Sequence, residues 1–523
     1  MIAEKVPPVQ PALRRPIPLL ACMLLSLSAV GVFAAYHLAS TAFWYDESMQ
    51  FWMSLGLDGF GPPHTQPGGF WAAIHNNALA NLDPGGFTLI LHTWLQFGTG
   101  AMWQRTLPFL FFLGGVIGLG WMGWSYTKSL PFALLCCAVP ALFPLILDYS
   151  TEVRAYSMEF AGVVIGCTLL DRLEKHPTMW RALTTGIVFG FFLTARYSFV
   201  LFSMAAGLVL MARLGRAETG WSKLQPLFAF TLPLSGVSVL IVAVTLRPQY
   251  MARISYHGGE LIQYLAATTA ADKSASQIGT MLAVNLLFPF ALPLTTAALL
   301  GALILLPRKL ATPARLDRIA VSLESSTLAS FCILCFAAII LTALVWRWHP
   351  WDIRTKWSLW LQALSAVAVV RFAASALACC APTDGSGRED QRITALVVFA
   401  MLTLDLRLAL YRRSPWPSFI PALTYLEQLS PPADSVAVDV HSYPTIRYFY
   451  EYGPLVSSRL YPEAFRLPYW NSPKQPISPQ TRYLVTGLTL AAANRMFAPA
   501  HILQYADLPE RLFRVEATAP TRE

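Results

Sequence analysis

Apolar runs of about 20 residues recur along most of this chain, and they restrict its fold more than any other feature. A helix of that length crosses the hydrocarbon core of a bilayer. Lipid offers no hydrogen-bond partner to an open backbone, so a crossing segment must be helical or belong to a closed barrel. The composition agrees, because 55% of the residues are hydrophobic and only 13% are charged. The sequence therefore predicts an α-helical polytopic membrane protein.

The lengths of the apolar runs predict about eleven transmembrane helices. The expected spans are 17–38, 106–125, 131–147, 157–171, 182–195, 198–212, 225–246, 283–306, 325–346, 358–378 and 393–411. Lys5, Arg14 and Arg15 precede the first run, which is longer than the apolar core of a signal peptide. We therefore expect an uncleaved first span with the amino terminus in the cytoplasm.

Lys and Arg residues gather in alternate connections between the runs, which predicts how the spans are oriented. The connections expected in the cytoplasm carry Lys128, Arg172, Lys175, Arg181, Arg213, Arg216, Lys223, Arg308, Lys309, Arg315, Arg318, Arg388 and Arg392. No basic residue lies between 40 and 104, so this first large loop is expected outside. The net charge of +9 thus reflects helix orientation and does not indicate a nucleic-acid partner.

Two further regions are expected on the outer side. Segments 51–58, 70–81 and 87–98 of the first loop are too short to span, and we expect them to lie at the membrane surface or to re-enter it. After about residue 412 the chain becomes polar, with expected strands at 435–440 and 481–486 and helices at 444–452 and 488–497. This predicts a transmembrane domain at 1–411 and a small soluble extracytoplasmic α/β domain at 412–523.

The spacing of His and Cys residues predicts no metal site. His64, His75 and His92 lie among aromatic residues without close ligand spacing, which favours interfacial packing. All eight Cys residues fall in or beside apolar runs, so no disulfide framework is predicted. Cys332 and Cys335 stand within one such run and indicate helix packing.

Asp46 and Glu47 form an acidic pair just after the first apolar run, where it gives way to a polar loop. A charge within the hydrocarbon costs several kcal/mol, so carboxylates at this level usually face water or a substrate. Asp46 is the first candidate for a catalytic group, with Glu47 orienting the loop or the acceptor. The alternative is that the pair only marks a helix end in the headgroup region.

Other charged and aromatic residues are expected at the same outer level: Asp83, Arg105, Tyr149, Glu152, Arg154, Tyr156, Arg347, Arg354 and Lys356. A carboxylate that accepts a proton, opposed by Arg residues that hold an anion, suits transfer from a phosphate leaving group. Arg binds phosphate oxygens through a planar fork. Three alternatives stay open: an Arg154–Glu152 salt bridge, lipid anchoring by Arg354 and Lys356, and a helix cap at Asp83.

The ordered motifs resemble those of a known superfamily. They are Trp44-Tyr45-Asp46-Glu47, then Leu82-Asp83-Pro84-Gly85-Gly86-Phe87 continuing to Trp94, then Gln104-Arg105-Thr106-Leu107-Pro108, then Tyr149-Ser150-x-Glu152-x-Arg154-x-Tyr156. This order resembles the GT-C superfamily of polyprenyl-phosphate-sugar-dependent glycosyltransferases, in the branch of protein O-mannosyltransferases and lipid A aminoarabinose transferases. Arg354 at the head of a late span resembles a recurring Arg of that branch.

The resemblance implies a GT-C fold with interfacial helices in the first outer loop and an inverting sugar transfer. It also implies an acidic residue at the Asp46 position near the acceptor and a basic residue like Arg154 near the donor phosphate. The chain departs from the pattern at Asp83-Pro84-Gly85, where aminoarabinose transferases carry Lys before Pro-Pro, so their donor contact is not carried over. Thr151 stands where Gln is commoner.

The expected function is a glycosyltransferase of the bacterial inner membrane, with its active site and carboxyl-terminal domain facing the periplasm. Asp46 would take the proton of an acceptor hydroxyl on a glycan, lipid or protein, and Arg154 with Arg354 would stabilise the departing polyprenyl phosphate. No cofactor is expected, although a divalent ion between Asp46 and Asp83 is an open alternative. Two other classes are a lipid or solute transporter of the envelope, which usually shows repeats and midplane charges, and a lipid-binding scaffold.

Overall fold

The structure, a computed structural model, describes residues 16–40, 43–81, 83–214, 221–251, 331, 333–335, 337, 341, 359–380, 387–413, 418–432, 435–439, 442–456, 465–466, 480–497, 500–505 and 507–516. The expected span 283–306 and most of 325–346 lie outside these residues. Arg347, Arg354 and Lys356 do as well. Their predicted positions and roles therefore stay predictions.

The described chain falls into two compact units. The first unit contains residues 1–35 and 108–411, and the second contains residues 36–107 and 412–523. The second unit therefore joins the first outer loop to the carboxyl-terminal segment, which we expected to be a domain alone. The physical reason is a set of buried side-chain contacts between these two segments, described below.

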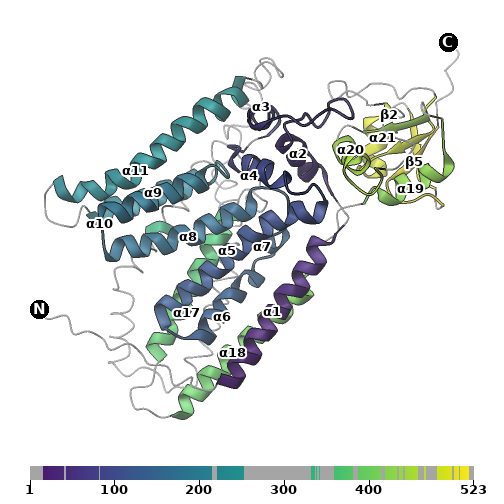
Figure 1. Cartoon of the computed structure of the whole chain (residues 1–523). Helices are drawn as coiled ribbons and strands as arrows, with labels where there is room; N and C mark the ends of the chain where they lie inside the picture. The colour runs from purple at the N-terminus through teal and green to yellow at the C-terminus, as the bar shows by residue number, and fades with distance from the viewer. Residues whose placement is uncertain are drawn as a thin grey trace, which may run out of the picture. The chain divides into compact units, whose positions relative to one another are not determined.

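The first unit is built from helices. They are α1 (Pro16–Leu38), α5 (Ala101–Thr127, which begins in the second unit), α6 (Leu130–Ala138), the 3₁₀ turn η1 (Val139–Leu142), α7 (Pro144–Asp148), α8 (Tyr156–Lys175), α9 (Met179–Leu193), α10 (Phe199–Leu214), α11 (Trp221–Ile241), the π-helical turn η2 (Val242–Leu246), α17 (Leu359–Cys380) and α18 (Gly387–Leu410). Figure 1 shows α1 running beside α18, and Ser26 of α1 donates a hydrogen bond to Asp405 of α18.

Within the described residues, four helices are long and apolar enough to cross a membrane: Leu20–Leu38, Ala101–Thr127, Leu224–Met251 and Ile393–Leu410. They agree with the predicted class of helical membrane protein, while the number eleven stays a prediction. The expected span 131–147 is not one continuous helix, because it breaks into α6, η1 and α7. Pro140 and Pro144 explain the breaks, since proline lacks the N–H that an α-helical turn needs.

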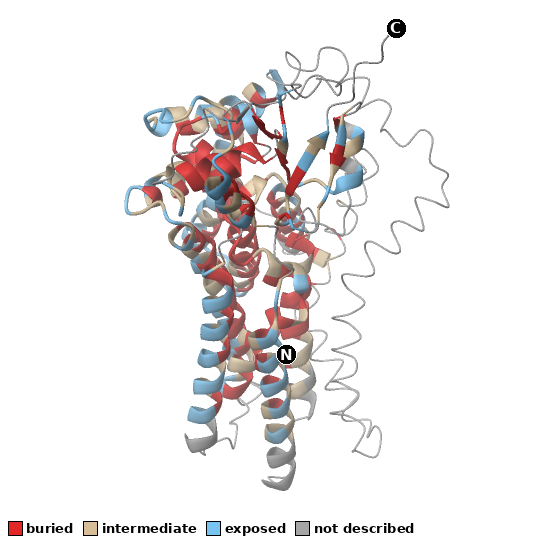
Figure 2. Ribbon diagram, turned by 90° about the vertical axis from the view of Figure 1, so that its right-hand side faces the viewer, coloured by how far each residue is buried: buried red, intermediate tan, exposed pale blue. Residues whose placement is uncertain are grey.

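Small residues let the helices of the first unit pack closely. Gly186 of α9 lies against the backbone carbonyl of Phe230 in α11, where any side chain would collide. Gly162 of α8 is similarly covered by the rings of Phe192 and Phe199. Such close approach of backbones is the usual way in which helices associate in lipid. In Figure 2 the long helices carry buried residues on one side and exposed residues on the other.

The second unit contains three short helices of the first loop and a small α/β sheet. The loop forms α2 (Tyr45–Ser54), α3 (Phe70–Ala80) and α4 (Gly86–Leu95), close to the expected interfacial segments. The carboxyl-terminal part forms α19 (Ile420–Leu429), β1 (Val436–Val438), α20 (Tyr443–Glu451), β2 (Phe465–Arg466), β3 (Tyr483–Val485), α21 (Leu490–Met496), β4 (His501–Leu503) and β5 (Leu512–Glu516).

The sheet has the strand order β2-β1-β3-β5-β4. Strand β1 is parallel to β2 and β3, and β5 is antiparallel to β3 and β4. The parallel strands β1 and β2 have α20 between them in the chain, as a crossover between parallel strands requires. The hydrophobic core of this α/β segment contains Ala437, Leu484, Ala493, Phe497, Ile502 and Phe513. The expected strands and helices of this segment thus agree with the structure within a few residues.

Candidate functional site

The acidic pair lies in the first turn of α2 and not in a loop, which corrects the sequence-based expectation. The helix begins directly after Trp44, whose backbone is extended, and Ser48 donates its backbone N–H to the carbonyl of Trp44. Carboxylates in a first helical turn interact favourably with the positive end of the helix dipole. Asp46 is partly exposed, whereas Glu47 is buried. Helix geometry therefore gives the two neighbouring carboxylates different environments.

Glu47 is held by a two-pronged ion pair with Arg105 at the start of α5. The Nε atom of Arg105 lies 3.1 Å from Oε1 of Glu47, and its Nη2 atom lies 2.9 Å from Oε2. Glu47 is 1% exposed and Arg105 4% exposed, so water hardly screens the pair. Arg105 also donates to the carbonyl of Ser40 and lies over the ring of Phe43. The predicted substrate residue Arg105 thus connects α5 to both ends of the 40–47 segment.

A buried polar network joins α2, α3 and the start of α4. Gln50 donates through Nε2 to Oγ1 of Thr88 at 2.8 Å, and Thr88 donates to Oδ1 of Asn77 at 2.7 Å. Asn81 donates to Asn77 at 3.0 Å and to Gln50 at 3.3 Å. A fully connected network of this kind rigidifies a fold in a low dielectric. It fixes the backbone on which Asp46 stands.

Asp83 lies at the edge of this network and is 6% exposed. Its backbone carbonyl accepts a 3.0 Å hydrogen bond from the side-chain amide of Asn77. The N-cap position of α4 is taken by Gly85, with a φ of 94° that favours glycine, and Asp83 stands two residues before it. Its predicted role as a substrate residue stays a prediction.

Helix α20 packs directly against α2. The hydroxyls of Ser48 and Thr445 lie 3.0 Å apart, and the indole N–H of Trp52 donates to the carbonyl of Pro444 at 2.9 Å. The guanidinium of Arg447 lies 4.0 Å from the centre of the Trp52 ring. All of these contacts are buried, so the carboxyl-terminal segment holds the helix that carries the acidic pair.

Tyr448 extends the same interface toward α5. Its ring stacks on Phe43 at 4.3 Å, and its hydroxyl lies 3.4 Å from Nε2 of Gln104 and 3.3 Å from the carbonyl of Thr99. Burial raises the pKa of Tyr448 above its usual range, with a smaller raising effect from the charge of Glu47. The phenol therefore stays neutral and can donate its proton to the backbone.

The motif from Tyr149 to Tyr156 connects α7 to α8 in the first unit. The rings of Tyr149 and Tyr156 lie 4.4 Å apart, and Ser157 donates to the carbonyl of Tyr149 at 2.8 Å. Glu152 is buried, and its carbonyl accepts the backbone N–H of Arg154 at 2.6 Å. Arg154 itself is partly exposed. The turn thus presents one basic side chain beside the amino terminus of α8.

Sequence reasoning missed a second charged group at this end of α8. Glu159 of α8 is 0% exposed and lies 3.3 Å from Nη1 of Arg196, which is 2% exposed. Ser198 donates to the other carboxylate oxygen of Glu159, and the Arg196 guanidinium lies 4.5 Å from the centre of the Tyr156 ring. An ionisable residue inside an apolar run, as at Glu159, is the signal that could have found it.

Two further polar contacts lie deeper among the helices of the first unit. Asp171 of α8 accepts from Arg371 of α17 at 2.6 Å and also from the hydroxyl of Tyr126. Asp405 of α18 accepts a hydrogen bond from the hydroxyl of Ser26 at 2.7 Å. Each carboxylate thus has a local partner, as buried polar groups require.

Among the residues that the structure describes, no three His, Cys, Asp or Glu side chains lie close enough to hold a metal ion. The imidazole Nδ1 of His92 lies 2.7 Å from the carbonyl of Ser54. One of the two ring nitrogens of His92 is thus engaged by the backbone. A comparison with models of known protein families gives no match. A comparison with functionally curated proteins gives none either.

Proposed function

We propose that this protein is an inverting membrane glycosyltransferase. It transfers a sugar from a polyprenyl-phosphate-linked donor to an acceptor hydroxyl at the outer face of a bacterial inner membrane. The sugar is carried on a phosphomonoester lipid, and the acceptor is a glycan, lipid or protein. The proposal rests on the ordered charged motifs of the sequence and on the environment of one carboxylate.

The difference between Asp46 and Glu47 carries the proposal. Glu47 is buried in a two-pronged ion pair with Arg105, so its charge stabilises the fold around α2. Asp46, one position earlier on the same helical turn, is partly exposed and can meet a hydroxyl from the solvent side. A general base must lie within hydrogen-bond reach of the proton that it takes. Asp46 fits that role and Glu47 serves as a positioning residue.

The chemistry is a single displacement. Asp46 accepts the acceptor's hydroxyl proton, the acceptor oxygen bonds to the anomeric carbon, and the bond from that carbon to the phosphate oxygen breaks. The electron pair leaves on the polyprenyl phosphate, and the sequence resemblance assigns the balancing of its charge to a basic residue of the Arg154 type. A guanidinium suits this role because it stays charged and binds two oxygens at once. Glu159, Arg196 and Ser198 support the Tyr156 end of the same turn.

The transporter alternative has less support. A transporter usually needs ionisable groups that change partners near the bilayer midplane. In the described helices Asp405 is satisfied by Ser26, and Asp171 by Arg371 and Tyr126. These contacts suit helix packing without substrate movement.

The test compares the wild-type chain with Asp46→Asn in cells that lack the native gene product. Mass spectrometry of envelope glycans and glycoproteins should reveal a sugar that the wild type adds and the variant does not. Loss of a general base commonly lowers turnover by about 10²–10⁴-fold. Asp58→Asn is the matched control, because Asp58 is an exposed carboxylate of the same loop. Equal sugar transfer by Asp46→Asn and wild type would refute the assignment.

A further inference from the structure

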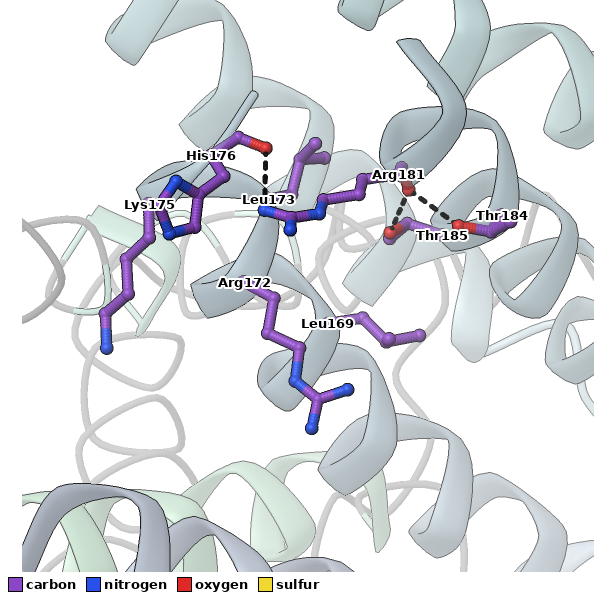
Figure 3. Close-up of a pocket in the computed structure, with 8 residues that line it drawn as sticks. All are labelled: Leu169, Arg172, Leu173, Lys175, His176, Arg181, Thr184 and Thr185. Carbon is purple, nitrogen blue, oxygen red and sulfur yellow. Dashed lines mark hydrogen bonds between the residues drawn. The ribbon is translucent and has the colours of Figure 1, made fainter. Parts of the chain in front are cut away.

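A basic cavity lies at the far end of α8 from the Arg154 turn. Its volume is about 420 Å³, and it opens between the last two turns of α8 and the first two turns of α9. Arg172 and Lys175 line it from α8, His176 lines it from the position just after α8, and Arg181 lines it from α9. Figure 3 shows the Arg181 side chain crossing from α9 to the backbone carbonyl of His176, a contact of 3.5 Å. Two helices thus contribute basic residues to the lining of one cavity.

The charges of these basic residues are not neutralised from within the cavity. None of the described residues that line the cavity is acidic. Asp171, the neighbour of Arg172 in the chain, accepts hydrogen bonds from Arg371 and Tyr126 on α17 and α5. Arg172, Lys175 and Arg181 are all exposed. Arg172 lies 5.6 Å from the centre of the Trp121 ring and Lys175 lies 5.9 Å from the centre of the Tyr126 ring, and neither contact neutralises the positive charge. Arginine and lysine are the side chains that bind phosphate oxygens best.

Apolar residues lie beside the basic ones in this cavity. Leu169 and Leu173 are one turn apart on α8 and share a face with the basic residues, since positions three and four apart lie side by side on a helix. Beside the cavity, at the start of α9, Met179 is 50% exposed and Trp180 is 71% exposed. Exposed Trp is typical of residues at the boundary between lipid and water. A ligand that fits both the basic and the apolar residues has a charged head and an apolar tail.

We infer that this cavity binds the phosphate group of an anionic phospholipid, with its acyl chains along the apolar helices. A free phosphate ion would satisfy the basic residues but would leave the partly exposed Leu169 and the exposed Met179 and Trp180 unused. The cavity is separate from the Arg154 turn of the same unit. Arg154 and Lys175 are 21 residues apart, and α8 alone spans about 30 Å. The inference therefore holds whether or not the chain is a glycosyltransferase.

The test is native mass spectrometry of the full-length protein in detergent, titrated with phosphatidylglycerol or phosphatidylcholine. The wild type should retain phosphatidylglycerol and not phosphatidylcholine. Arg172→Gln combined with Arg181→Gln should weaken retention roughly 25-fold, at about fivefold for each basic residue near an anionic headgroup. The matched control is the double variant Lys128→Gln with Arg495→Gln. It also removes two positive charges, but from exposed positions that do not line the cavity.

The outcomes separate the possible ligands. Unchanged phosphatidylglycerol retention in the double variant, or an equal loss in the control, would overturn the inference. Competition by inorganic phosphate at the concentration of the lipid would identify a free phosphate site and overturn the lipid as its source. The single variant Arg181→Gln changes one exposed side chain, should fold normally, and should show about a fivefold loss. Wild-type retention in that folded variant would also count against the site.

Discussion

Breaking the buried Glu47–Arg105 pair should loosen the whole first turn of α2. Arg105→Met preserves most of the side-chain volume but leaves the Glu47 carboxylate, 1% exposed, without the guanidinium at 2.9 and 3.1 Å. Removing one partner of a buried ion pair costs about 3–5 kcal/mol, because the other charge stays desolvated. The double variant Glu47→Gln with Arg105→Met should cost much less than the sum of the two single variants.

Hydrogen exchange measured by mass spectrometry on the peptide covering Tyr45–Ser54 provides a local readout. A loss of about 3–5 kcal/mol in local opening free energy corresponds to exchange faster by roughly two to three and a half orders of magnitude, at tenfold for every 1.4 kcal/mol. The control is Glu510→Gln, an exposed surface change that should alter stability by less than about 0.5 kcal/mol.

The reasoning would fail if Arg105→Met left the exchange of this peptide within threefold of the wild type. It would also fail if the double variant exchanged as fast as the two single effects combined. Either result would mean that the pair does not hold α2, and that Glu47 is available for a direct role with substrate. Sugar transfer in the double variant then decides between a positioning role and a catalytic one.

Three further predictions follow from the same contacts. Arg154→Ala should lower both donor binding and turnover, and Arg154→Lys should restore them only partly because the planar fork is lost; equal activity of the Lys variant would make Arg154 a general charge. The folded-state pKa of Tyr448 is raised, so this tyrosine stabilises the fold fully below the ordinary tyrosine pKa of 10.0 and less as pH rises above it. Between pH 9 and 11.5 the thermal unfolding temperature should therefore fall less in Tyr448→Phe than in the wild type. Single Cys residues at Thr65 and Thr194 in a Cys-free chain should react with an impermeant maleimide outside right-side-out vesicles, and Cys at Thr178 should not. Labelling of Thr65 and Thr178 but not of Thr194 would instead place the 87–98 segment across the membrane.

The local pattern of residues was enough to predict much of the fold. Long apolar runs predict long helices wherever they occur, because an unbroken run can satisfy its backbone only within itself in lipid. Helix α1 accordingly matches its expected span within one residue, and α5, α8 and α18 overlap their expected spans with ends that differ by up to six residues. The alternating polar segment after residue 412 likewise indicated β1 and β3. The break at Pro140 and Pro144 was readable too, although it was not predicted.

The candidate site depended on contacts between residues that are distant in the sequence. The sequence singled out Asp46 and Glu47 together, but only the folded chain shows that Arg105, 58 residues later, buries one carboxylate and leaves the other partly exposed. The packing of the first loop against α20, through Ser48 and Thr445, could not be predicted from the sequence, because a single Ser or Thr gives no indication of its partner. Periodicity and composition report what each segment prefers by itself. Which buried charges meet is decided by tertiary packing, where desolvation makes a close partner necessary.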